Sequence, residues 1–82
     1  MDNNFQQIFT IHFPEKQVYI EHTFKTLEEK MKEIKGNKDH RLYNMLKDNP
    51  NPEIRFECYR DQSYNEKLVA SNYKKNYYKI LT

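Results

Sequence analysis

The sequence predicts a small α+β domain in which a three-stranded antiparallel sheet is flanked by helices, with its elements in the order β-β-α-α-β-α. Three observations lead to this prediction. Apolar residues alternate with polar ones at residues 8–13 and again at 54–59, and they recur at helical spacing elsewhere. A chain of 82 residues with 37% hydrophobic content also suffices for one domain with one small core.

The first two strands form a predicted β-hairpin over residues 8–21. Phe9, Ile11 and Phe13 occur at a spacing of two, which is typical of a strand with one buried face. Pro14 has no amide hydrogen and cannot continue a ladder of hydrogen bonds, so residues 14–17 are expected to form a turn. The apolar residues 18–20 then provide the returning strand.

A capping box predicts the start of the first helix. The hydroxyl of Thr26 and the carboxylate of Glu29 can each accept a hydrogen bond from an otherwise unpaired amide. A start one turn earlier, at Thr23, would bring Phe24 onto the buried side. Gly36 is expected to end the helix in the left-handed conformation. The residues that share the predicted buried face are Leu27, Met31 and Ile34.

A second, short helix and a third strand are expected next. Asp39 can cap the helix, and the N-P-N-P run at 49–52 stops it because proline removes a donor and restricts the residue before it. Residues 54–59 alternate as a strand. The predicted inward side chains are Leu42, Met45 and Leu46 on the helix and Ile54, Phe56 and Cys58 on the strand.

A second capping box, Ser63 with Glu66, predicts the start of the last helix. Its apolar residues extend to Ile80, so the helix is expected to reach that position. Tyr78 falls outside the buried stripe and is available for a partner. The expected stripe consists of Tyr64, Leu68, Val69, Tyr73, Tyr77 and Ile80.

Charge and composition limit the possible functions. Fourteen Lys and Arg against twelve Asp and Glu leave a net charge of +2, too weak a bias to imply a nucleic-acid ligand. The single Cys58 excludes an internal disulfide, and the scattered His12, His22 and His40 suggest no zinc site. No apolar run is long enough for a signal peptide or a membrane span, so the chain is expected to be soluble, intracellular and cytoplasmic by default.

Five stretches of the chain are similar to the GIY-YIG nuclease domain. The similarity covers about residues 8–81 of a single domain spanning 1–82, and it implies the same β-β-α-α-β-α order of elements. The matching stretches are F-T-I at 9–11, V-Y-I at 18–20, L-E-E-K-M at 27–31, R-L-Y-N-M-L at 41–46 and I-R-F-E at 54–57.

The resemblance also implies where the chemistry would lie. In that family two tyrosines act on the attacking water, an arginine stabilises the phosphate, and a glutamate on the last helix holds one divalent cation. The two tyrosine positions fall on Phe9 and Tyr19, the arginine on Lys30, an accessory histidine on Ile34, and the glutamate at or near Asn72.

These substitutions predict a domain that has lost its activity. Phe9 lacks the hydroxyl, Lys30 cannot form a two-pronged bond to phosphate, and the amide of Asn72 is a poor magnesium ligand. Glu21 replaces a glycine and is expected to block the backbone approach of a ligand. The predicted function is a catalytically inactive binding module, an adaptor or an inhibitor, with no cofactor and no metal site. Mg²⁺ or Mn²⁺ enters only in the alternative of an active DNA endonuclease that recruits a non-standard acid.

The target of such a module is either nucleic acid or a protein. A second alternative is a homodimer with an aromatic interface. In a third interpretation, which the shared helix face favours, the tyrosines pack in the core and the lysines only decorate the helix. The candidate residues are Lys30, Lys67, Lys74, Lys75 and Lys79 for nucleic acid, and Tyr73, Tyr77 and Tyr78 for a partner chain.

Overall fold

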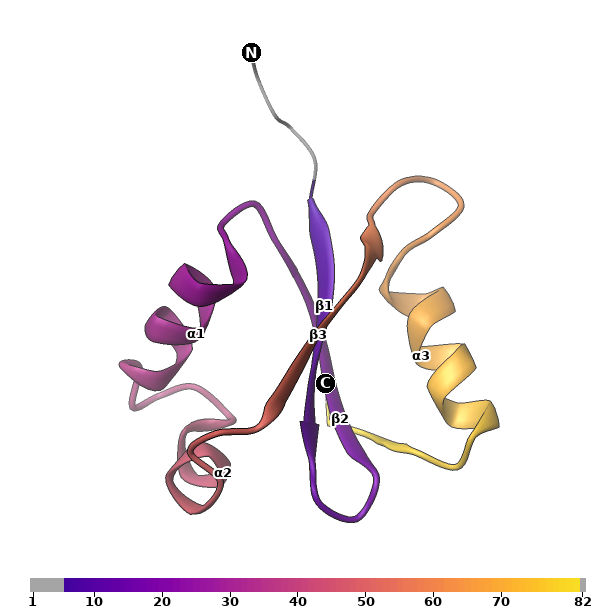
Figure 1. Cartoon of the computed structure of the whole chain (residues 1–82). Helices are drawn as coiled ribbons and strands as arrows, with labels where there is room; N and C mark the ends of the chain where they lie inside the picture. The colour runs from indigo at the N-terminus through magenta and orange to yellow at the C-terminus, as the bar shows by residue number, and fades with distance from the viewer. Residues whose placement is uncertain (1–5, 82) are drawn as a thin grey trace.

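The computed structural model describes residues 6–81 and has an α+β fold (Figure 1). The predicted order β-β-α-α-β-α is confirmed, and one further short strand follows it. The elements are β1 (Gln7–Phe13), β2 (Gln17–Thr23), α1 (Leu27–Lys35), α2 (Tyr43–Asp48), β3 (Glu53–Tyr59), α3 (Glu66–Lys75) and β4 (Lys79–Ile80).

The sheet has four strands in the order β3-β1-β2-β4 and is mixed, which corrects the expected three-stranded antiparallel sheet. β1 pairs antiparallel with both β2 and β3, whereas β4 runs parallel to β2. The added strand exists because Tyr77 adopts a left-handed φ of 66° and turns the chain back toward the sheet. The amide of Lys79 then donates to the carbonyl of Lys16 at 2.8 Å, and that of Leu81 to Val18 at 2.8 Å.

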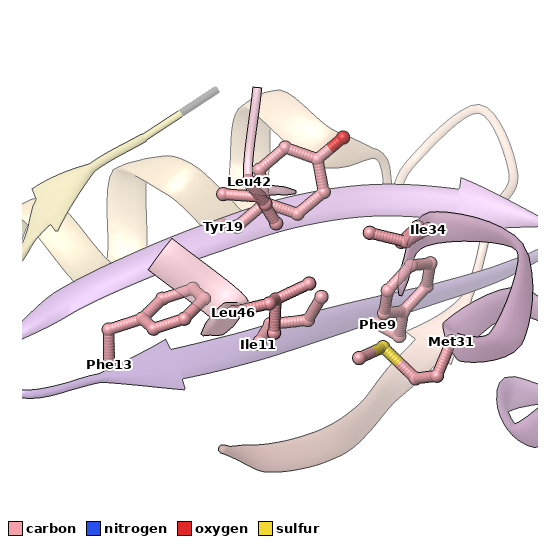
Figure 2. Packing of buried hydrophobic residues seen from close by; sticks show 8 residues of the cluster. All are labelled: Phe9, Ile11, Phe13, Tyr19, Met31, Ile34, Leu42 and Leu46. Atoms are coloured by element: carbon pink, nitrogen blue, oxygen red, sulfur yellow. The ribbon is translucent and has the colours of Figure 1, made fainter. Parts of the chain in front are cut away.

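Helices cover both faces of the sheet. α1 and α2 lie on one face and α3 on the other (Figure 1). The larger core is on the α1/α2 face, and Figure 2 shows its eight buried side chains packed together: Phe9, Ile11, Phe13, Tyr19, Met31, Ile34, Leu42 and Leu46. The smaller core, on the α3 face, consists of Ile8, Val18, Ile20 and Val69. Alternate residues of β1 therefore enter different cores.

The capping box at Thr26 is confirmed as the start of α1. The Glu29 amide donates to the Thr26 hydroxyl at 3.1 Å, and the Thr26 amide donates to the Glu29 carboxylate at 3.3 Å. The earlier start at Thr23 is wrong, and Phe24 is exposed. Gly36 ends the helix in a right-handed conformation with φ of −86°, so the expected left-handed cap is wrong too.

Asp39 does not cap the second helix, although that helix forms. α2 begins after Leu42, which makes no side-chain cap. The reason is that a series of turns from Asn37 to Tyr43 uses the backbone groups first, and the Leu42 amide donates to His40 Nδ1 at 3.1 Å. Leu42 and Leu46 are nevertheless buried and Met45 partly buried, as predicted.

A β-bulge in β3 changes the predicted orientation of Cys58. Ile54 packs against the larger core, as expected, but Cys58 packs against the smaller core on the other face. Cys58 is opposite Ile8 while Phe56 is opposite Phe9, so β3 contains one extra residue, Glu57, in this interval. Alternation from Phe56 already places Glu57 on the α3 face, and the extra residue brings Cys58 to that face as well.

The last helix is shorter than predicted and starts later. Its cap is Asn65, whose side chain accepts the amides of Lys67 and Leu68 at 3.0 and 3.2 Å, and not Ser63. Tyr64 and Leu68 are exposed. Because the helix ends at Lys75, Tyr77 is 87% exposed, whereas Tyr78 and Ile80 pack against the smaller core with Tyr73. The predicted roles of Tyr77 and Tyr78 are therefore exchanged.

The two possible caps of α3 can be separated by mutation. Asn65→Ala should lower the free energy of unfolding by about 1 kcal/mol, since two amides of the first turn lose their acceptor. Ser63→Ala, the matched control, should change it by less than about 0.5 kcal/mol. Urea unfolding followed by circular dichroism measures both values, and a larger loss for Ser63→Ala would contradict the assignment of the cap.

Candidate functional site

Four polar side chains meet where the larger core reaches the surface. Tyr19 and Glu21 alternate on β2 and therefore lie on the same face of the sheet. The Tyr19 hydroxyl donates to Glu21 Oε1 at 2.5 Å, and Lys30 Nζ of α1 lies 2.8 Å from Glu21 Oε2. His40 Nε2 lies 3.5 Å from the Tyr19 oxygen. We call Tyr19, Glu21, Lys30 and His40 the Tyr19 cluster.

The hydrogen bonds fix the direction of each proton in the cluster. The amide of Leu42 donates to His40 Nδ1, so in neutral His40 the proton resides on Nε2 and points at the Tyr19 oxygen. Tyr19 in turn donates its own proton to Glu21. Figure 2 shows this hydroxyl pointing away from the apolar side chains around the Tyr19 ring. The cluster is a chain of donors that ends on one carboxylate.

The electrostatics hold both protons in place. Burial raises the pKa of Tyr19, and the carboxylate of Glu21 raises it further. Burial alone would lower the pKa of Lys30, but the hydrogen bonds and negative charges of Glu21 and Glu33 outweigh it, so the pKa of Lys30 is raised. At neutral pH the phenol stays protonated and the ammonium stays charged. Neither group can act there as a base.

The cluster leaves Lys30 little freedom to bind an external anion. Its side chain is only 16% exposed, and two carboxylates, Glu21 at 2.8 Å and Glu33 at 3.3 Å, already neutralise it. The sequence singled out Glu21 but did not predict its ion pair with Lys30, because this contact depends on how α1 packs against the sheet.

The remaining residues that the resemblance singled out do not join this cluster. Phe9 and Ile34 are buried in the larger core beneath it. Asn72 is exposed on α3, which covers the opposite face of the sheet. The structure thus brings Tyr19 and Lys30 together through Glu21, and it separates both from Asn72.

The donor set of the cluster does not fit a divalent cation. Residues 6–81 contain no group of three or more His, Cys, Asp or Glu side chains that could hold a metal. Glu21 is the one carboxylate between Tyr19 and Lys30, and both of its oxygens already accept hydrogen bonds. A cation would have to displace the ammonium of Lys30 from this carboxylate.

A second polar cluster, on the α3 face, was not predicted. Thr10 and Tyr73 both donate to Glu57 Oε2, at 2.7 and 2.5 Å, and His12 Nε2 lies 2.9 Å from the Thr10 oxygen. Burial lowers the pKa of His12, and the charge of Arg55 lowers it further, so His12 is neutral at pH 7. The cluster was missed because its members come from β1, β3 and α3, which lie far apart in the sequence.

Three of the predicted basic residues, Lys74, Lys75 and Lys79, lie at the end of α3 and the start of β4. Lys16, from the β1–β2 turn, donates to the carbonyl of Asn76 at 3.2 Å and lies 5.4 Å from the centre of the Tyr78 ring. This brings the turn beside the end of α3 and the start of β4. We define the basic patch as Lys16, Lys74, Lys75, Tyr77 and Lys79, all exposed.

The lysines of the basic patch are not neutralised by carboxylates of the part of the chain that the structure describes. Among residues 6–81, none of them forms an ion pair. The β1–β2 turn and residues 74–79 together contain four lysines and one acid, Glu15, so this region carries a net positive charge. Lys67 lies seven residues before Lys74 on the same side of α3, about 10.5 Å away, and extends the patch along the helix.

Comparison with known proteins identifies no relative: no protein-family model, no curated protein and no solved structure matches the chain. In the described part of the chain, every helix is too short or too polar to cross a bilayer. The geometry of the surfaces is therefore the main basis for a functional proposal.

The raised pKa of Tyr19 predicts a distinct alkaline titration. Tyr19 should ionise above the ordinary value of 10.0, and this component should be absent from Tyr19→Phe in the ultraviolet absorbance of tyrosinate. Because the pKa of Tyr19 is higher in the folded state, the protonated phenol stabilises the fold below pH 10. This contribution to the free energy of unfolding is lost as the pH rises further. Glu21→Gln should lower the pKa toward 10.0. A Tyr19 that titrates normally in the folded chain would contradict the proton arrangement.

Proposed function

We propose that this protein is a catalytically inactive, GIY-YIG-like domain that binds single-stranded nucleic acid through its basic patch. The observation that carries the proposal is the contrast between its lysines. Lys30, at the position of the family's phosphate-stabilising arginine, is neutralised by two carboxylates, while Lys74, Lys75 and Lys79 are exposed and unpaired within residues 6–81. The available positive charge therefore lies on the α3 side.

Three features support the loss of activity. The phenol of Tyr19 holds its proton against Glu21, so it is a poor base for activating water. Lys30 is a point charge and not the planar fork that stabilises a phosphate in the transition state. At the position on the last helix where the family has a metal-binding glutamate, this chain has Asn72, and α3 lies on the far face of the sheet.

The chemistry of the patch supports nucleic acid as the ligand. Lysines attract phosphates and release their counterions, and an exposed aromatic ring gives a base a surface on which to stack. Tyr77 is 87% exposed and lies between Lys75 and Lys79 in the chain. Its left-handed backbone holds it outside the core, so the ring is available without any rearrangement of the fold.

A second candidate function rests on the contact of Glu21 with Tyr19 and Lys30. If Glu21 exchanged the ammonium of Lys30 for Mg²⁺ or Mn²⁺, the cluster would contain a tyrosine, a lysine and a carboxylate, as a metal-dependent endonuclease with a non-standard acid requires. The homodimer alternative now depends on Tyr77, because Tyr73 and Tyr78 pack against the smaller core.

Plasmid nicking tests the loss of activity. With Mg²⁺ or Mn²⁺, the wild-type chain should nick supercoiled plasmid no faster than Tyr19→Phe, since no group of the Tyr19 cluster is free to act as a base or to hold the metal. Nicking that disappears in Tyr19→Phe, in Lys30→Ala and in Glu21→Gln would instead establish the endonuclease.

Binding of labelled single-stranded DNA tests the basic patch. Lys74→Glu with Lys75→Glu should weaken binding and reduce the slope of log K against log salt by roughly 0.7 for each phosphate that the protein no longer neutralises. Tyr77→Ala should weaken binding by about 1 kcal/mol or more, because no ring remains for a base to stack on.

The matched control for this experiment is Lys32→Glu with Lys35→Glu, which changes net charge equally on the other face of the sheet. Equal losses of affinity in the two double variants would show that only net charge matters. Absence of DNA binding at low salt, with a solution mass of twice the monomer, would favour the homodimer.

A further inference from the structure

A groove runs between α1 and β3 on the α1/α2 face. Its volume is about 410 Å³, and its walls are Leu27, Glu28, Met31, Lys32, Lys35 and Ile54. The side chains of Leu27, Met31 and Ile54 give it an apolar floor. A neighbouring hollow of about 200 Å³ shares Lys35 and continues past Tyr43, Leu46, Lys47 and Pro50 toward the end of α2.

The floor continues along β3, where an aromatic side chain is exposed. Phe56 is opposite Phe9 on β1, so its ring is on the same face as the larger core. Phe9 is fully buried, yet Phe56 is 47% exposed. β3 is an edge strand of the sheet. On its apolar side Ile54 is partly buried against the larger core, and Phe56 is exposed.

The rim of the groove is positively charged. Lys32 and Lys35 on α1 and Lys47 on α2 are exposed, and among residues 6–81 none of the three forms an ion pair. Glu28 is the one acid among the residues that line the two hollows. An apolar floor beside unpaired cations is complementary to a segment that has both apolar and acidic side chains.

From this we infer that the groove between α1 and β3 is a docking site for an acidic amphipathic helix of a partner protein. Such a helix would lie over Ile54 and Phe56 and beside α1, as an additional member of the helical layer, at the usual interaxial distance of about 8–10 Å. Its apolar side chains would cover the floor, and acidic side chains one turn apart would face Lys32 and Lys35.

A second copy of this chain is a poor occupant of the groove. The helices within residues 6–81 already bury their apolar faces, with Met31 and Ile34 of α1, Leu46 of α2 and Val69 of α3 in the two cores. None of these helices within residues 6–81 has a free apolar stripe to offer to another molecule. This favours a different protein as the occupant over a second copy of the chain.

The test uses the full chain, labelled with ¹⁵N, and a designed helical peptide. The peptide has leucines at i, i+4 and i+7 and glutamates on the flank that faces α1, and a second peptide replaces those glutamates with lysines. The acidic peptide should shift the amide signals of Leu27, Lys35 and Ile54 and should bind at least tenfold more tightly than the basic one. Lys32→Glu with Lys35→Glu should reverse this preference.

Both substitutions are on the exposed side of α1, so the double variant should remain folded. Its amide spectrum checks this directly. Equal binding of the two peptides, or signal shifts confined to α3, would overturn the inference. So would a rise in solution mass without peptide that Phe56→Ser abolishes, since the groove would then be a self-association site. The DNA affinity should not change in the Lys32 and Lys35 variant, so this result does not depend on the basic patch.

Discussion

The fold depends on burying the central strand β1 from both sides. Ile8, Phe9, Thr10 and Ile11 are all fully buried, and they alternate between two separate cores. One of these residues is polar, and a buried hydroxyl without a partner would cost stability. Glu57 of β3 resolves this conflict, because its side chain lies on the α3 face, where its carboxylate accepts the proton of Thr10. A charged residue of an edge strand thus satisfies the buried polar group of β1.

The Tyr19 cluster shows how one residue can redefine a site. Glu21 accepts a hydrogen bond from Tyr19 and forms an ion pair with Lys30. One carboxylate therefore keeps the phenol protonated and compensates the charge of the ammonium. The apolar surroundings strengthen these interactions, because burial favours the protonated phenol. A cation that lies inside such a closed arrangement is a structural component, and the exposed positive charge without ion pairs in residues 6–81 lies on lysines elsewhere on the surface.

Local signals in the sequence predicted the local structure well. The hairpin, the capping box at Thr26 and the buried stripe of α1 depend on residues close together in the chain. The bulge at Glu57 and the turn at Tyr77 depend on pairing with distant strands, and a one-residue change there alters which side chains are inside. For the same reason the sequence suggested Tyr19 and Lys30 as neighbours but gave no indication of His40 or of the reach of Glu21.

The position of the sheet between two helical layers has a geometric consequence. The basic patch and the groove beside β3 are on opposite faces, separated by the full thickness of the strands. Occupants of the two surfaces would not compete for space, so a ternary assembly would be sterically permitted. Any communication between them would have to pass through β1 and β2, the most tightly packed part of the molecule, which favours independent occupancy over cooperativity.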